Sequence, residues 1–235
     1  EGASKGEGLG NQFLSNIRET DAILHLVRCF ENDDIIHVSG KVSPLDDIET
    51  INTELALADL FSAEKVYQKA LKTSKAGQKE GLPLKNLLEK ILPALEEGLA
   101  VRSLEFNEEE TQLLKSLQLL TSKPVLYVAN VNEDGFDNNP HLAKLIDYAS
   151  SENSQVVSVC ADIEAEIAEL DEEDKQGFLD EMGQTESGLD RLIKAGYRLL
   201  GLHTYFTAGP KEVRAWTINI GDSAPVAAGK IHGDF

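Results

Sequence analysis

The chain has 235 residues, 41% hydrophobic and 27% charged, which suits a globular protein of one large domain or two ordinary ones. No run approaches about 20 uninterrupted apolar residues, so the sequence excludes a membrane-crossing helix. Cys29 and Cys160 lie far apart without a CxxC pair, and the five histidines show no HExxH or HxH spacing. These patterns exclude a disulfide scaffold, predict no metal site, and favour a reducing cytosol.

The net charge of −19 means that the chain as a whole repels nucleic acid, so no DNA partner is expected. Residues 64–90 differ, because seven lysines against three glutamates give them +4 and leave −23 for the rest. Charge patterning alone is typical of a solvated helix pair with its lysines in water. The alternative is a docking surface for a polyanion. Its lysines would be Lys65, Lys69, Lys72, Lys75 and Lys79.

The first forty residues predict a loop, a helix and a strand. Residues 1–12 are glycine-rich and polar, which indicates a mobile loop. Apolar residues at helical spacing predict a helix over 11–19. The mostly apolar run 22–30 predicts a strand covered on both faces of a parallel sheet. His25 falls inside this run and is interpreted as a core residue rather than a catalyst.

The next segment carries helix signals only. A long helix is expected over 44–74, because Ser-Pro-Leu-Asp at 43–46 places a capping serine, a first-turn proline and an acid in order. A second amphipathic helix should follow a Gly/Pro break, with Pro93 kinking it. A capping box at 107–110 opens a third helix. Residues 44–120 are therefore predicted to be a helical hairpin with an extra helix.

The second half of the chain returns to strands. Apolar runs at 124–131 and 155–160 predict buried strands, with a helix between them opened by Asn139 and a proline. This order requires a parallel sheet with right-handed crossovers, in which ligands bind at the carboxyl ends of the strands. Further helices are expected at 162–170, 172–182 and 187–202, and strands at 204–206 and 213–220.

Three stretches carry long, specific motifs. They read GASKGEGLGNQFLSNIRETDAILHLVRCFENDDIIHVSG at 2–40, NVNEDGF at 130–136 and TYFTAGPKEVRAW at 204–216. Together they resemble the YchF group, the Obg-like ATPases of the translation-factor class of P-loop proteins. The resemblance covers nearly the whole chain. It departs from the family pattern only mildly, at His203, Pro210 and Gly233.

The resemblance implies an α/β fold in three parts. A P-loop NTPase-type domain with a partial parallel sheet would comprise residues 1–43 and 121–203. An inserted antiparallel helical coiled-coil domain would comprise residues 44–120, and a partial β-grasp TGS domain residues 204–235. No GxxxxGK[ST] phosphate loop occurs in the sequence. The chain is therefore expected to be part of a longer protein and to be inactive alone.

The loop after the second predicted strand, residues 130–133, is expected to determine whether the protein binds adenine or guanine. In GTPases the equivalent loop reads Asn-Lys-x-Asp, and its carboxylate accepts two hydrogen bonds from guanine, whereas adenine offers only an acceptor at N1. Here Glu133 is one methylene longer than that aspartate, and Val131 replaces the lysine. Paired hydrogen bonds discriminate by about 10⁴ or more, and altering them loses that discrimination. ATP is therefore predicted over GTP, as the resemblance also implies.

The base of the nucleotide is expected to bind at two loops, which follow the predicted strands at 124–131 and 155–160. The glycine-rich opening would lie beside the γ-phosphate, and Mg²⁺ ligands are expected outside this chain. No catalytic base is named, since the resemblance implies a hydrophobic residue at the usual glutamine position upstream. Cys160 could contact the base, or it could be a small buried apolar residue. Cys29 could be a small buried apolar residue too. The predicted nucleotide-binding residues are Asn130, Val131, Asn132, Glu133, Ser158, Val159 and Cys160.

The function implied by the resemblance is that of a cytoplasmic ATPase. It would hydrolyse ATP to ADP and phosphate with Mg²⁺ and act as a conformational switch on the ribosome. The helical and TGS domains would dock, with the lysine segment against ribosomal RNA. Two alternatives stay open at this point. One is a GTPase of the same family, and the other is a non-catalytic ribosome- or protein-interaction module.

Overall fold

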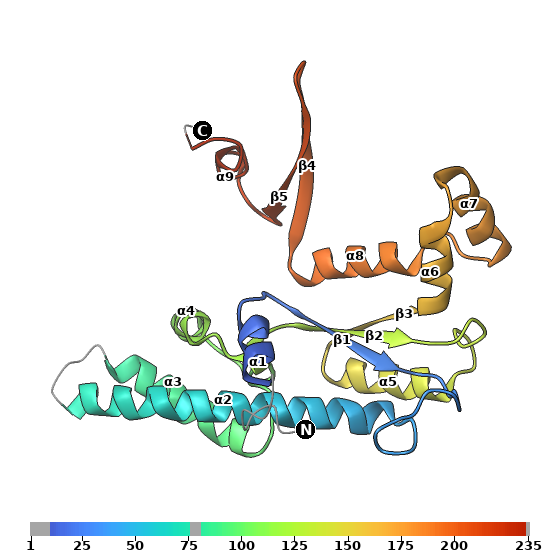
Figure 1. Cartoon of the computed structure of the whole chain (residues 1–235). Coiled ribbons are helices and arrows are strands. Elements are labelled where there is room, and N and C mark those ends of the chain that lie inside the picture. Colours follow the sequence, from blue (N-terminus) through green and yellow to red (C-terminus); the bar gives the residue numbers. More distant parts are fainter. Residues whose placement is uncertain (1–9, 76–80, 234–235) are drawn as a thin grey trace. The chain divides into compact units, whose positions relative to one another are not determined.

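The computed structural model describes residues 10–75 and 81–233 and contains two compact units, residues 1–158 and 159–235 (Figure 1). Most of the glycine-rich opening lies outside the described residues. The first helix, α1 (Gly10–Arg18), begins one residue before the predicted start. It shows that the end of the predicted loop, residues 10–12, is helical instead.

The first unit combines a parallel sheet with long helices. The sheet has the strand order β1-β2-β3, and β1 pairs with β2 from Ile23↔Val125 to Arg28↔Asn130. Two short 3-10 turns follow helices of this unit: η3 (Val101–Ser103) lies between α3 and α4, and η4 (Leu120–Ser122) lies between α4 and β2. The remaining elements are β1 (Ile23–Arg28), α2 (Pro44–Lys75), α3 (Leu82–Glu96), α4 (Glu108–Leu117), β2 (Val125–Asn130), α5 (Pro140–Ser151) and β3 (Gln155–Val159).

Local capping signals explain where the helices of this unit begin. Helix α2 starts at Pro44, one residue after the predicted capping serine. Before α4, the Asn107 side chain accepts a hydrogen bond from the backbone N–H of Glu110, whose own side chain accepts from the Asn107 N–H, both at 2.9 Å. The predicted capping box is therefore confirmed. Pro93 lies near the end of α3, and described residues 44–75 and 81–120 contain no strand.

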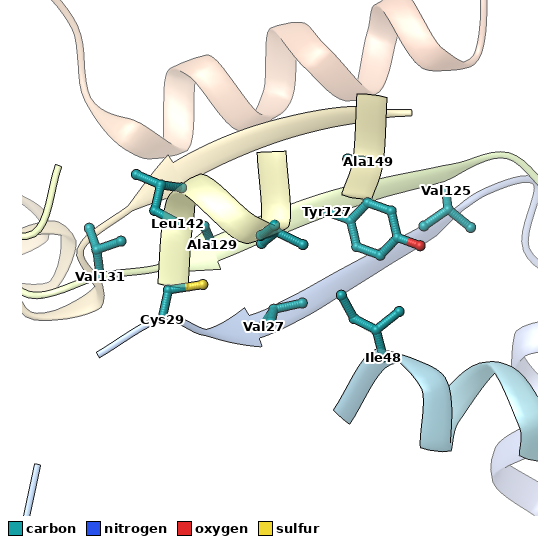
Figure 2. Packing of buried hydrophobic residues seen from close by; sticks show 10 residues of the cluster. Val27, Cys29, Ile48, Val125, Tyr127, Ala129, Val131, Leu142 and Ala149 are labelled. Atoms are coloured by element: carbon teal, nitrogen blue, oxygen red, sulfur yellow. The ribbon is translucent and has the colours of Figure 1, made fainter. Parts of the chain in front are cut away.

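The core of the first unit lies between the sheet and two helices. Alternate residues of β1 and β2 point to one face, where they meet the start of α2 and the inner face of α5 (Figure 2). Tyr127 is fully buried at the centre of this cluster. The clustered residues are Val27, Cys29, Ile48, Val125, Tyr127, Ala129, Val131, Leu142, Leu145 and Ala149.

The expectation that the first strand is covered on both faces is wrong for the described residues. The side chains of Leu24 and Leu26 are 54% and 65% exposed, whereas β2 is buried along both faces. Within the described residues, β1 is the edge strand of this three-stranded sheet and β2 is its central strand. An uninterrupted apolar run does not distinguish these two positions.

His25 occupies the covered face of β1, as a core residue should. Its ring centroid lies 5.6 Å from that of Tyr127. Burial, assisted by the charge of Arg102 and opposed by Asp47, lowers the pKa of His25 below its ordinary value of 6.5. The histidine therefore stays neutral in the folded state under conditions that protonate it in the unfolded chain.

This neutral histidine predicts a loss of stability in mild acid. As the pH falls below about 6.5, the unfolded state takes up the proton first, so the free energy of unfolding should decrease until the folded-state pKa is reached. Urea midpoints at about pH 7 and pH 5 measure the effect, and His25→Gln should reduce the difference. His203→Gln on the exposed side of β4 is the control. A His25→Gln protein with the full wild-type decrease would contradict the prediction.

The second unit contains three helices, an antiparallel hairpin and a short terminal helix. The hairpin pairs Leu202↔Asn219 through Ala208↔Val213, so β4 is longer than predicted. Helix α8 ends before the predicted residue 202, because Gly201 adopts a left-handed φ of +62° that stops the helix. The elements are α6 (Ala161–Glu169), α7 (Glu172–Glu181), α8 (Gly188–Leu199), β4 (Leu202–Ala208), β5 (Val213–Asn219) and α9 (Ala224–Gly229), the last of which was not predicted.

Candidate functional site

Four of the predicted site residues lie at the end of β2 and in the loop after it, and they differ in whether their side chains are accessible to a ligand. Asn130 is half-buried, and its carbonyl accepts a hydrogen bond from the Cys29 N–H at 2.8 Å. The Val131 side chain is only 2% exposed and belongs to the core cluster beside Cys29 (Figure 2). Asn132 and Glu133 are exposed. A ligand at this edge could therefore reach these two side chains, but only the backbone of Val131.

Gly135 closes the loop, which we call the 130–135 loop. Its N–H donates to the Asn132 carbonyl at 2.9 Å. A Cβ on this glycine would stand 3.0 Å from the Asn132 nitrogen and 3.1 Å from its carbonyl oxygen. Glycine is therefore needed because the backbone folds back closely on Asn132, although its φ is unexceptional. No local sequence pattern indicates that Gly135 has this role.

Asn139 joins the 130–135 loop to the end of β1. Its Nδ2 donates to the carbonyls of Cys29 at 2.8 Å and of Gly135 at 3.0 Å. Its Oδ1 accepts from the backbone N–H groups of His141 at 3.0 Å and Leu142 at 3.2 Å, which caps α5. The sequence identified Asn139 as a helix start, but gave no signal of the two bonds that its amide donates.

The remaining predicted residues follow one another at the end of β3. Ser158 is the half-buried last residue of the first unit, and buried Val159 is the first residue of the second. Cys160 precedes α6 as its N-cap, and its carbonyl accepts from the Glu164 N–H at 3.0 Å. Its side chain is buried. Any contact that this segment makes with a ligand would therefore come mainly from its backbone.

Within the second unit, Glu164 fixes the start of α8. Its carboxylate accepts from the N–H groups of Gly188 at 2.6 Å and Leu189 at 3.0 Å. A Cβ on Gly188 would lie 2.6 Å from the Glu164 carboxylate and 3.0 Å from Val159. A side chain at this position would force these neighbours to move, because α8 starts close to Val159 and to the Glu164 carboxylate.

Cys29 is a packing residue in this structure. Its side chain is fully buried, and burial raises the pKa of its thiol to about 12. A neutral, inaccessible thiol is neither a nucleophile nor a ready target of oxidation. Cys29 therefore contributes an apolar side chain and the backbone groups that hold the 130–135 loop.

The described residues offer no ligand set for Mg²⁺. Within residues 10–75 and 81–233, no three His, Cys, Asp or Glu side chains are grouped so that they could hold a metal ion. These side chains are therefore assigned no role in binding Mg²⁺. In the same part of the chain, no helix combines the length and apolarity needed to span a membrane.

Two cavities of the first unit lie away from the predicted residues. One, of about 380 Å³, lies between Phe136 and Ile146, beside the start of α5. The other, of about 560 Å³, lies between α2, the residues after α3 and the end of α5. In its wall, Glu152 accepts hydrogen bonds from Tyr127, Tyr148 and Arg102. Neither cavity is lined by Asn130 to Glu133.

Comparison with known proteins finds relatives that match the whole chain. The family model YchF-GTPase_C, described as a protein of unknown function (DUF933), matches residues 202–235. The ribosome-binding ATPase YchF of Haemophilus influenzae is 61% identical over 100% of this chain, and that of Escherichia coli O157:H7 is 60% identical over the same share. Over its whole length the chain is therefore similar to YchF proteins. It spans 64% and 65% of the lengths of these two YchF relatives.

More distant YchF proteins show the same similarity. The ribosome-binding ATPase YchF of Bacillus subtilis is 57% identical over 100% of this chain and 65% of its own length. The solved structure of the Schizosaccharomyces pombe YchF GTPase matches with a TM-score of 0.86 and 34% identity, over 97% of this chain and 62% of that one. The chain therefore has the YchF fold, while these relatives differ in the nucleotide that they are named for, ATP for the bacterial proteins and GTP for the yeast protein.

Proposed function

We propose that this chain forms part of a cytoplasmic, ribosome-associated ATPase that hydrolyses ATP to ADP and phosphate as a conformational switch. Support comes from relatives named ribosome-binding ATPase at about 60% identity over the whole chain. The observation that carries the nucleotide assignment is the 130–135 loop, which presents Glu133 at the carboxyl edge of a parallel sheet. Magnesium ligands are expected outside this chain.

The base preference follows from two side chains of that loop. An aspartate at the position of Glu133 would pair with the two donors of guanine, but the longer side chain places its oxygens beyond that point unless the loop moves. Val131 packs into the core, so no cation extends along the base from its position. Both features remove interactions that favour guanine, and ATP is the proposed substrate.

Nucleotide competition on the intact protein tests this proposal. ATP should displace a fluorescent ATP analogue at a concentration at least about tenfold lower than GTP, because the guanine-specific pair is absent. Glu133→Asp should move the ratio of affinities toward GTP. Asp134→Glu changes the length of the neighbouring exposed acid by the same methylene and should leave the ratio unchanged. Binding of GTP at least as tight as that of ATP would make the protein a GTPase.

Turnover distinguishes an enzyme from a non-catalytic module. The chain has no GxxxxGK[ST] sequence, so it should not hydrolyse ATP alone, whereas the intact protein should. An intact protein that binds the ribosome but shows no turnover, with or without ribosomes, would favour the interaction module.

The proposed RNA contact is concentrated on one face of α2. Lys65, Lys69 and Lys72 are exposed at a spacing that places them on the same side of the helix. Within the described part of the chain, none of the three forms an ion pair with an acid, although Lys65 lies 3.8 Å from the centre of the Phe61 ring. The Lys75 side chain and Lys79 lie outside the described residues.

The lysines of α3 are less suited to the same contact. Lys85 pairs with Glu89 at 2.8 Å, and Lys90 pairs with Glu110 at 3.1 Å. Each of these charges is compensated within the helical region, so α2 carries most of the unpaired positive charge. A polyanion that docks on this region should therefore approach α2 rather than α3.

Charge reversal on α2 should weaken ribosome binding. Changing Lys69, Lys72 and Lys75 to Glu in the intact protein removes contacts that release counterions from RNA, so less protein should co-sediment with ribosomes, and the salt dependence should become shallower. The same triple change at exposed Lys41, Lys115 and Lys144 alters the net charge equally and is the control. Unchanged binding with a steep salt dependence would place the contact elsewhere.

A further inference from the structure

Both ends of the 130–135 loop are connected to the backbone of Cys29, the residue that follows β1: one end directly and the other through the Asn139 side chain. The Cys29 N–H donates to the carbonyl of Asn130, where the loop begins. The Cys29 carbonyl accepts from the Asn139 amide, and the same amide nitrogen donates to the carbonyl of Gly135, where the loop ends. The loop is therefore closed at its base by a ring of three hydrogen bonds, and Asn139 supplies two of them.

Only asparagine satisfies all the partners at this position. Two carbonyls face Nδ2 and require N–H donors, while two backbone N–H groups face Oδ1 and require an acceptor. Aspartate would place a carboxylate oxygen about 3 Å from two carbonyl oxygens. Serine would keep the cap of α5, since it is as good an N-cap as asparagine, but its side chain is too short to make the same bonds to both carbonyls.

A second contact holds the start of α5 to the same end of β1. The His141 ring lies 3.0 Å from the Glu31 carboxylate, two residues after Cys29. This contact tethers the helix but does not touch the loop. The bond from Asn139 to Gly135 therefore connects the α5 start to the loop end, next to Phe136, which packs against the core cluster.

We infer that Asn139 is a positioning residue that sets the place of the 130–135 loop and, through it, the base selectivity of the nucleotide site. The inference rests on the proposed function, because it assumes that this loop meets the base. Without the amide clamp, the loop end is released from β1 and Glu133 is displaced. The contacts between this loop and the base should then weaken.

The test compares Asn139→Ser with wild type in the intact protein, using ATP, GTP and inorganic tripolyphosphate as competitors of a fluorescent ATP analogue. The expected result is an affinity for ATP that is up to about tenfold weaker, the cost of losing one hydrogen bond to the base, and an ATP-to-GTP ratio closer to one. The affinity for tripolyphosphate, which has no base, should not change. Asn139→Asp should show the same pattern, since it also keeps the cap and loses both donors.

Controls separate positioning from stability. Asn107→Ser makes the same substitution at the N-cap of α4, away from the loop, and should leave all three affinities unchanged. Equal losses for ATP and tripolyphosphate, or wild-type ATP and GTP affinities in Asn139→Ser, would overturn the inference. A wild-type protein that does not prefer ATP to tripolyphosphate would instead refute the proposed base site.

Discussion

Replacement of Asp59 by alanine is expected to lower the free energy of unfolding by about 3–5 kcal/mol, the usual cost of breaking a buried ion pair by removing one partner. Asp59 lies in the middle of α2 and is fully buried. Its Oδ1 accepts from the Leu120 N–H at 2.9 Å, and its Oδ2 accepts from the N–H and hydroxyl of Thr121 at 2.7 and 2.8 Å. Arg18 of α1 lies 3.3 Å from Oδ1.

The expected loss is large because Asp59 connects three segments that are distant in the sequence. Alanine would leave the backbone N–H groups of Leu120 and Thr121 buried without this acceptor, and each such group costs about 1–3 kcal/mol. It would also leave the guanidinium of Arg18 without its carboxylate, although Arg18 keeps hydrogen bonds to the Gln118 carbonyl at 3.0 Å and to the Ser62 hydroxyl at 3.1 Å.

The titration of Asp59 acts in the opposite direction to ordinary acid unfolding. Burial raises the pKa of this carboxyl, while its hydrogen bonds and Arg18 oppose that change. Because the folded-state pKa is above the unfolded value, the folded state takes up this proton first as the pH falls. As the pH falls, the titration of Asp59 therefore raises the free energy of unfolding, whereas the titration of His25 lowers it.

Urea denaturation of Asp59→Ala measures the effect. Glu64→Ala is the matched control, since it removes an exposed acid from the same helix and should change stability by less than about 0.5 kcal/mol. Arg18→Ala should cost less than Asp59→Ala, and the double variant less than the sum, because the two residues share one interaction. If Asp59→Ala and Glu64→Ala were equally stable, the contacts by which Asp59 joins the three segments would not stabilise the fold.

The sequence predicts those features whose causes lie within a few residues. The proline after Ser43 and the capping box at Asn107 locate two helix starts, because a cap is a local hydrogen bond. Asp59 gives no such signal, since in the sequence it resembles any acid on a helix surface and its partners are about 60 residues away. Buried polar contacts of this kind depend on tertiary packing and are not visible in a local pattern.

The same limit applies to the candidate site. The sequence places Asn130 to Glu133 after a strand, and the structure places them at the carboxyl edge of the sheet. The sequence does not predict that the Val131 side chain points into the core, because this depends on which face of β2 the helix α5 covers. The clamp by Asn139 was missed for a related reason, since its partner Cys29 is 110 residues away.

The helical hairpin that carries the lysine face should depend on the apolar cluster between α2 and α3. Leu88 is fully buried in α3, and the cluster joins it to small residues of α2 such as Ala56 and Ala63. Leu88→Ala should lower the free energy of unfolding by about 2–5 kcal/mol, because it removes apolar contact and leaves a cavity that closely packed helices fill only partly.

Leu82→Ala provides the comparison, because Leu82 is 47% exposed on the same helix and its truncation leaves no enclosed cavity. Urea denaturation gives the two losses, and hydrogen exchange of the α2 and α3 amides locates them. The backbone amides of both helices should exchange faster in the Leu88 variant, since each helix is stabilised by packing against the other. It should also bind ribosomes less well as the temperature rises, because Lys65, Lys69 and Lys72 act together only while α2 is ordered. Equal losses for the two variants would mean that the hairpin is held by contacts outside this cluster.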